Sequence, residues 1–170
     1  MINRSDKKAF YGVPSDGGEA VFTRMRYFTE LSTSKNPKEY SRQYVDEKTE
    51  RADVVGYSPS MSYSFDDTEN DAVLEDIVSI TNGEKLGIEA HREIIQVDFT
   101  KPSGDGFEAV KRKFAVIADS EGDSTDAYTY GGTFKAVGDK VFGVATIATP
   151  DGGDAESVET ITFTEEKVGE

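Results

Sequence analysis

The most constraining stretch of this sequence is a short run in which apolar and small polar residues alternate strictly. Met61, Tyr63 and Phe65 alternate with three serines. Because successive side chains of a strand point to opposite faces, this run predicts a β-strand with one apolar and one small polar face. Pro59 precedes the run, at a position where a missing N–H removes no bond from the sheet. This strand must bury its apolar face against another part of the fold.

A short helix is predicted directly after this strand. Residues 66–71 (DDTEND) are rich in short acceptor side chains, which bond free backbone N–H groups and favour a helix start. At the other end, Asn82-Gly83 is expected to supply the left-handed cap that ends the helix. A helix of this length is marginal alone, so we expect it to pack on a sheet through one apolar stripe, formed by Val73, Leu74, Ile77, Val78 and Thr81.

The rest of the chain carries further strand patterns, separated by turns rich in glycine, proline and aspartate. We expect strands within residues 21–31, 40–45, 60–65, 88–99, 110–118, 128–136, 141–147 and 158–164. The predicted fold class is mostly β, an antiparallel β-sandwich or partly closed barrel with one short α-helix packed on it. A single domain over residues 1–170 accounts for the length, with an N-terminal arm over residues 1–9 that is flexible or ordered only by a neighbour.

A highly charged segment lies between two of the predicted strands. Residues 46–53 (DEKTERAD) carry six charges in eight positions. We therefore expect a long hairpin tip that projects into solvent over residues 46–56. In an isolated domain, such a tip is ordinarily a mobile loop.

The composition argues against several classes of protein. With 33 acidic and 19 basic residues, the net charge of −14 does not suit a protein that grips phosphate backbones through a basic groove. The chain contains no cysteine, which excludes disulfides and thiol chemistry. The N-terminus lacks the apolar core of a signal peptide, and no window approaches the ~20 apolar residues of a membrane span. We expect a protein of an aqueous compartment, without membrane insertion.

The sequence also lacks the patterns that usually carry catalysis. No nucleophile-elbow, dinucleotide-binding or phosphate-loop motif is found. His91 lies between charged neighbours without an evident catalytic or ligand partner, which favours a structural or surface role. The acidic segment 119–127 fails the calcium-loop pattern, because its glycine is at the fourth place and Tyr130 is at the twelfth. We therefore expect no catalytic residues, no metal, no cofactor and no enzymatic activity.

The segment 40–83 resembles the major tail tube proteins of long-tailed bacteriophages and phage-like bacteriocin particles. The resemblance lies in the order YSRQYVDEKTE, then VVGYSPSMSYSFD, then a short acidic-capped helix that ends in NG, and it covers about a quarter of the chain. It implies a structural virion protein of the tail that assembles in the bacterial host cytoplasm. In that family, hexameric rings stack into a tube, and their inward-facing sheets form one barrel around a channel for DNA.

The resemblance also suggests roles for particular residues. The charged tip would contact the next ring, and the inter-ring candidates are Asp46, Glu47, Lys48, Thr49, Glu50 and Arg51. Small polar and acidic residues would face the channel, where they repel DNA gently at short range. The lumen candidates are Ser60, Ser62, Ser64, Gln96 and Asp98, although these strand faces could equally be ordinary solvent faces.

The implied partners are further copies of this chain, together with the tape-measure, tail terminator and tail tip proteins. A sheath is a further candidate, and DNA would pass without specific binding. Two other hypotheses stay open. One is a monomeric β-sandwich binding module, although its aromatic residues would be expected in loops, and here they lie mainly in predicted strands. The other is a secretion-system tube protein of similar fold.

Overall fold

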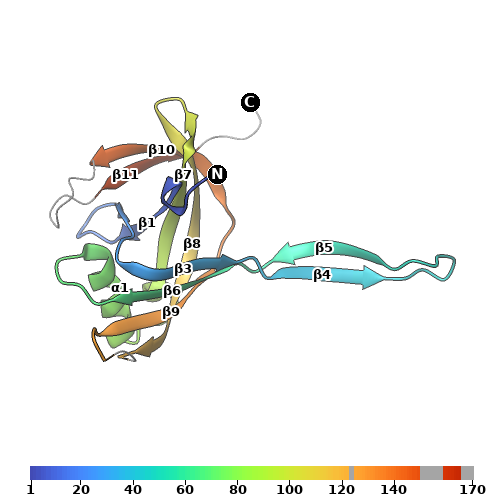
Figure 1. Ribbon diagram of the computed structural model, residues 1–170, viewed down its shortest axis with the longest axis horizontal. Helices are drawn as coiled ribbons and strands as arrows, with labels where there is room; N and C mark the ends of the chain where they lie inside the picture. The colour runs from blue at the N-terminus through green and yellow to red at the C-terminus, as the bar shows by residue number, and fades with distance from the viewer. Residues whose placement is uncertain (123–124, 150–158, 166–170) are drawn as a thin grey trace.

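The computed structural model describes residues 1–122, 125–149 and 159–165 (Figure 1). One α-helix, two short 3-10 helices and eleven strands are found within these residues. In chain order, they are η1 Arg4–Asp6, β1 Lys7–Val13, β2 Val21–Arg24, β3 Phe28–Ser34, β4 Pro37–Arg42, β5 Arg51–Tyr57, β6 Ser60–Asp66, α1 Ala72–Asn82, η2 Gly87–Ala90, β7 His91–Ser103, β8 Gly106–Glu121, β9 Thr129–Ala136, β10 Val141–Thr149 and β11 Thr160–Glu165.

Six of the strands close into a small barrel. They follow one another in the order β10-β11-β2-β1-β7-β8, and an additional pairing of β10 with β8 joins the two ends. At this closure a Cβ on Gly106 would come within 2.2 Å of the Ala145 carbonyl oxygen, so the close approach of β8 and β10 requires glycine. The interior is filled by an apolar cluster of Phe10, Ile95, Val97, Ala109, Ala145 and Ile161, with Phe22, Phe99, Phe107 and Phe163 packed around it.

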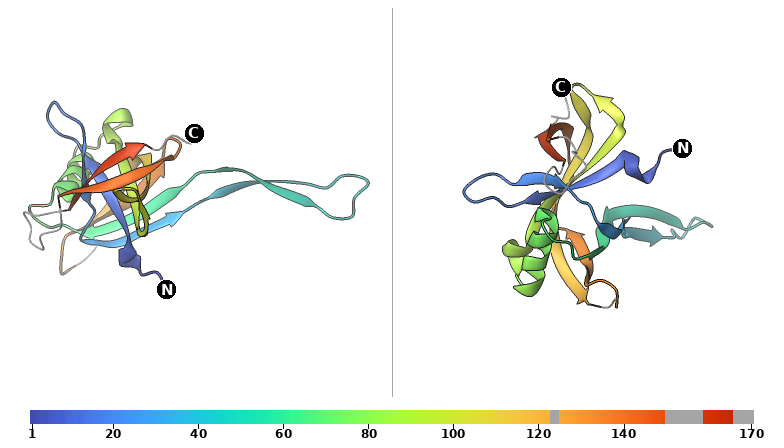
Figure 2. Two further views of the ribbon diagram at one scale, coloured as in Figure 1. Left: turned by 90° about the horizontal axis from the view of Figure 1, so that it is seen from above. Right: turned by 60° about the vertical axis from the view of Figure 1, so that its left-hand side comes forward.

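The long strand β8 belongs to two parts of the fold. Its first half closes the barrel, and its second half pairs with β9, from which the sheet continues to β6 and β3. The alternating residues Met61, Tyr63 and Phe65 of β6 are buried, as the sequence predicts. They form a second core with Phe134 and the apolar stripe of α1, which lies beside β6 and β9 in Figures 1 and 2. The ring of Tyr63 stacks on that of Phe134, with 4.4 Å between their centroids.

Helix α1 begins as its acidic leader predicts. The Asp71 carboxylate is buried and accepts hydrogen bonds from the backbone N–H groups of Val73 and Leu74, at 3.1 and 3.2 Å. The predicted left-handed cap is wrong in detail. Gly83 at the C-terminus is right-handed with φ −80°, and the residue with positive φ is Glu84 (φ 46°). The helix ends because Glu84 takes the left-handed position, so that the Glu84 and Lys85 N–H groups turn back to the Thr81 and Ile80 carbonyls, at 3.3 and 3.2 Å.

Two predicted boundaries are wrong near the N-terminus. The expected strand over residues 21–31 is divided into β2 and β3, because Tyr27 takes a positive φ of 67° and turns the chain from the barrel to the extended sheet. The expected arm of residues 1–9 is shorter, because β1 begins at Lys7 and pairs with both β2 and β7. The side chain of Ala9 is buried in the second core.

The charged tip is also shorter than predicted. Residues 51–56, which were expected to be loop, form most of β5, so that the connection between β4 and β5 runs only from 43 to 50. In the acidic segment 119–127, β8 continues to Glu121, and residues 123–124 lie outside the described part of the chain. The prediction of a mostly β fold, an antiparallel β-sandwich or partly closed barrel with one packed helix, is confirmed, and the barrel of six strands is fully closed.

Candidate functional site

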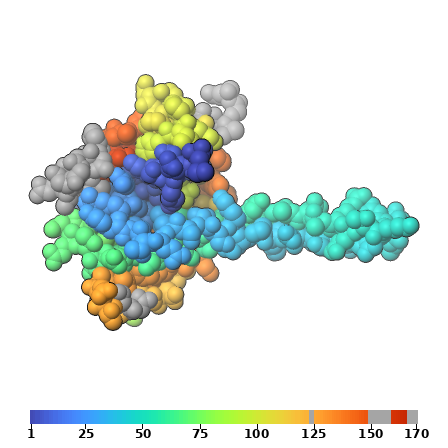
Figure 3. Space-filling view, in the orientation of Figure 1, coloured from blue at the N-terminus to red at the C-terminus, as the bar shows by residue number. Residues whose placement is uncertain are grey.

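The β4–β5 hairpin, residues 37–57 and here called the arm, is separate from the nine-stranded sheet. Figures 1 and 2 show it projecting from the side of the molecule, and Figure 3 shows a narrow rod with no other part of the chain against it. At ~3.3 Å per residue, the path from Pro37 to Asp46 spans about 30 Å. All six inter-ring candidates lie at its far end: Asp46, Glu47, Lys48, Thr49 and Glu50 in the turn, and Arg51 at the start of β5.

The arm exposes more apolar surface than a solvent loop requires. Tyr40, Val54, Val55 and Tyr57 are each at least half exposed, with values of 51%, 52%, 57% and 60%. A two-stranded ribbon has no second layer in which to bury such side chains, and an isolated hairpin is at best marginally stable in water. Burial of this surface therefore requires another molecule.

A face of small polar side chains covers the extended sheet on the side opposite α1. Since Met61, Tyr63 and Phe65 point into the core beneath α1, Ser60, Ser62 and Ser64 point the other way. Their cross-strand partners on β3 and β9 continue this face. Ser32, Ser62 and Thr133 stand opposite one another across three strands, and Ser34, Ser60 and Lys135 form the next row. We call this surface the serine face.

Gln96 and Asp98 do not belong to the serine face. On β7 they point to the same side as Ile94, which packs in the core under α1. They therefore lie on the face of the continuous sheet that is opposite to the serine face. Both line an open cleft of about 1040 Å³ between the barrel and β3. There Asp98 pairs with Lys7 at 3.7 Å, and hydrogen bonds from Thr100 lower the pKa of its carboxyl. The five lumen candidates therefore cannot line one channel surface together.

The extended sheet has two open edges among the described residues. Strand β3 is the last in the strand order and pairs only with β6. The other open edge belongs to the end of β8. Strand β7 pairs with β8 only up to Ala115, and β10 pairs with β8 only up to Lys111. The segment 116–121 of β8 therefore pairs with β9 alone. On the β3 edge, the Leu31 carbonyl accepts a hydrogen bond from Arg4 Nη2 at 3.4 Å. Open edges of this kind are templates for pairing with another chain.

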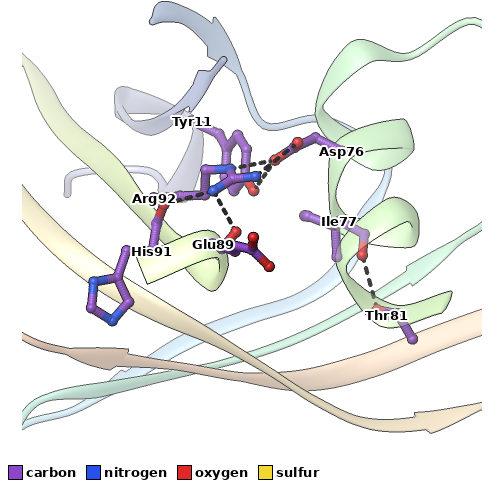
Figure 4. Close-up of polar contacts among 7 residues, drawn as sticks. All are labelled: Tyr11, Asp76, Ile77, Thr81, Glu89, His91 and Arg92. Atoms are coloured by element: carbon purple, nitrogen blue, oxygen red, sulfur yellow. Dashed lines mark hydrogen bonds and ion pairs between the residues drawn. The ribbon is translucent and has the colours of Figure 1, made fainter. Parts of the chain in front are cut away.

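A group of three polar residues, here called the polar lock, fixes α1 on the barrel. Figure 4 shows Tyr11 of β1 and Arg92 of β7 converging on Asp76 of α1. The Tyr11 hydroxyl donates to Asp76 Oδ2 at 2.5 Å, while Arg92 donates from Nε to Oδ2 at 2.8 Å and from Nη2 to Oδ1 at 3.3 Å. Burial, followed by the Asp76 charge, raises the pKa of Tyr11. Sequence reasoning missed this group, because Asp76 lies 65 positions after Tyr11 and 16 before Arg92.

The described residues offer little for catalysis or metal binding. No group of three or more His, Asp or Glu side chains in this part of the chain could hold a metal ion. The imidazole of His91 points away from the polar lock (Figure 4). None of the described helices has the length and apolar character needed to cross a membrane.

The combination of barrel, extended sheet and packed helix is the fold of phage tail tubes. Among the solved structures that the chain matches is the tail tube of SPP1, determined by solid-state NMR and cryo-EM. The match has a TM-score of 0.57 at 15% sequence identity and covers 84% of this chain and 78% of that chain. No protein-family model matches the sequence, and a search of curated proteins gives no match. The resemblance seen in the sequence is thus confirmed for the fold.

Proposed function

We propose that this protein is a structural subunit of a tail tube, in which copies join side by side into rings and the rings stack around a channel. The observation that carries the proposal is the arm: a hairpin about 30 Å long, with exposed tyrosines and valines, on a chain that has a tail tube fold. A structural role on this fold needs no catalytic group. Six copies per ring is the number that the family resemblance implies.

Ring formation follows from the two open edges of the extended sheet. If β3 of one copy pairs with the segment 116–121 of the next, each subunit contributes the four strands β8, β9, β6 and β3 to one continuous wall. The contact joins unlike edges, so it repeats around an axis until the ring closes and the edges disappear.

The serine face is our candidate for the channel surface. Its central row of Ser32, Ser62 and Thr133 carries hydroxyl groups and no charge. Strong binding of duplex DNA requires several cations on its phosphates, and the two rows of the serine face supply only one, Lys135. DNA would therefore pass without being held. Among the candidates from the sequence, Ser60, Ser62 and Ser64 stay in this role, and Gln96 and Asp98 fit a contact between subunits better, because they line the cleft beside the β3 edge.

The setting of this function is the tail of a virion, assembled in the cytoplasm of a bacterial host. The same stacking surfaces would meet tail tip proteins at one end of the tube and a tail terminator at the other. The tape-measure protein would occupy the channel before DNA, and a sheath would surround a contractile tail.

Removal of the arm tests the proposal. In the base of the arm, the Ser58 N–H donates to the Asn36 carbonyl at 3.3 Å, so a short Asn-Gly turn can replace residues 37–57 without separating β3 and β6. We expect the intact chain to form rings and tubes at rising concentration, and the shortened chain to keep its fold and lose stacking. Size-exclusion chromatography, circular dichroism and negative-stain microscopy measure these outcomes.

The control is the substitution Glu19→Ala in the exposed turn between β1 and β2, which leaves the arm intact. This variant should assemble as the intact chain does. A shortened chain that forms tubes of normal length would refute the role of the arm. An intact chain that stays monomeric even when mixed with preformed tube ends would favour the binding-module hypothesis instead.

A further inference from the structure

A cluster of three cationic side chains surrounds the base of the arm, here called the basic cluster. Lys35 lies in the turn between β3 and β4, Arg112 on β8 and Lys140 between β9 and β10. Arg112 Nε donates to the Gly138 carbonyl at 2.7 Å, which ties β8 to the β9–β10 connection. The Ala136 N–H donates to the Pro59 carbonyl at 3.0 Å, which places this connection beside the arm base, as Figure 1 also shows.

The basic cluster is unusual in a chain of net charge −14. Within the described part of the chain, none of its three members forms an ion pair with a carboxylate. Asp139 lies in the same turn as Lys140 and contributes one negative charge, so the three cations together with Asp139 keep a net positive charge. Partial burial, followed by the neighbouring charges of Lys35 and Arg112, lowers the pKa of Lys140. Like charges held together in this way would be stabilised by an anionic partner.

An anionic partner is present at the far end of the arm. Residues 46–51 carry three carboxylates and two cations, Lys48 and Arg51, which gives a net charge of −1. Glu47 forms an ion pair with Arg51, whereas Asp46 and Glu50 are exposed and form no ion pair within the described part of the chain. The turn therefore presents unneutralised negative charge at the point that lies furthest from the body of the molecule (Figure 3).

The arm separates these two groups within one molecule. Because its strands are extended, the tip lies about 30 Å from the basic cluster of the same chain, well beyond the screening length of ~8 Å at physiological salt. The tip can thus meet a basic cluster only on another copy. Such a contact joins unlike surfaces and does not close on itself, so each copy can give one tip and receive another along a filament.

We propose that the acidic tip of the arm of one copy binds the basic cluster at the arm base of a second copy. This contact rests on the proposed tube assembly and names the surface that receives the arm. A basic cluster also attracts DNA, but three cations on a chain of net charge −14 form a weak phosphate site, which favours the carboxylates of the tip.

Charge reversal in the full-length chain tests this inference. We expect Lys140→Glu and Glu50→Lys each to raise the critical concentration for tube formation at least tenfold. A single exposed ion pair contributes little, but the change recurs at every contact around a ring. The double variant Lys140→Glu/Glu50→Lys should return to within about threefold of the intact chain, because the reversed charges again attract.

Glu19→Lys is the matched control, since Glu19 is exposed in the turn between β1 and β2, outside the arm and both open edges. It should assemble as the intact chain does, and circular dichroism shows whether each variant keeps its fold. If the intact chain forms tubes and Lys140→Glu forms them equally well, the basic cluster does not receive the tip. The same result with altered DNA retention in the tubes would assign the cluster to DNA. If the intact chain forms neither rings nor tubes, the proposed function itself fails.

Discussion

Replacement of Asp76 by alanine should show how strongly the polar lock stabilises the fold. Asp76 accepts one hydrogen bond from Tyr11 and two from Arg92. The Arg92 side chain is only 11% exposed, so the substitution leaves a buried guanidinium without its counter-charge. Removal of one partner of a buried ion pair costs about 3–5 kcal/mol, a large part of the 5–15 kcal/mol that typically stabilises a domain.

Urea and thermal unfolding, followed by circular dichroism, measure this loss. For a domain of this size, each kcal/mol corresponds to roughly 2–4 °C, so we expect Tm to fall by about 6–20 °C. Asp76→Asn is the conservative comparison, because its amide oxygen can still accept a bond from the Tyr11 hydroxyl while the charge is lost. This variant should be destabilised less than Asp76→Ala. A loss below about 1 kcal/mol for Asp76→Ala would refute the reasoning, because it would mean that Arg92 is solvated after the change.

Two further predictions concern the contact between β6 and β9. Gly132→Ala should destabilise the fold by about 1–3 kcal/mol in urea unfolding, because its Cβ would lie 2.3 Å from the Ile117 carbonyl oxygen and 2.6 Å from the Tyr63 hydroxyl; a change within 0.5 kcal/mol would contradict this. Burial raises the pKa of Tyr63 from its ordinary 10.0 to about 12, so the folded state holds this proton more tightly than the unfolded state does. This stabilisation should be complete below pH 10 and be lost as pH rises through 12, at up to about 1.4 kcal/mol per pH unit, and a Tyr63→Phe variant that unfolds with the same alkaline pH dependence would disprove the assignment.

The sequence predicts best what neighbouring residues determine. The alternation in β6 is a local pattern, and the structure buries Met61, Tyr63 and Phe65 as expected. The acidic leader of α1 is likewise local, and Asp71 caps the helix that it precedes. Both patterns act within a few residues, so no knowledge of the rest of the fold is needed to interpret them.

Features that depend on distant pairings were not predicted. The barrel closes through the register of Val141 with Lys111, which no local pattern specifies. The division of the 21–31 strand follows from a turn at Tyr27, a residue type that rarely takes positive φ and gives no turn signal. The sequence indicates only that the lumen candidates are polar positions on strands. The sheet order is needed to show that Ser62 and Gln96 lie on opposite faces of the sheet.

In the proposed tube, the arm would connect the stability of the subunit to its assembly. Its two strands make backbone hydrogen bonds to each other, yet no described element covers either face, and its tyrosines and valines stay half exposed. A ribbon of this kind gains little from its own contacts against the entropy of ordering 21 residues. Docking on a second copy would bury the same side chains and supply the missing layer. If the proposed stacking occurs, the free energy that orders the arm would largely be the free energy of stacking, so ordering of the arm and growth of the tube would be coupled in one equilibrium.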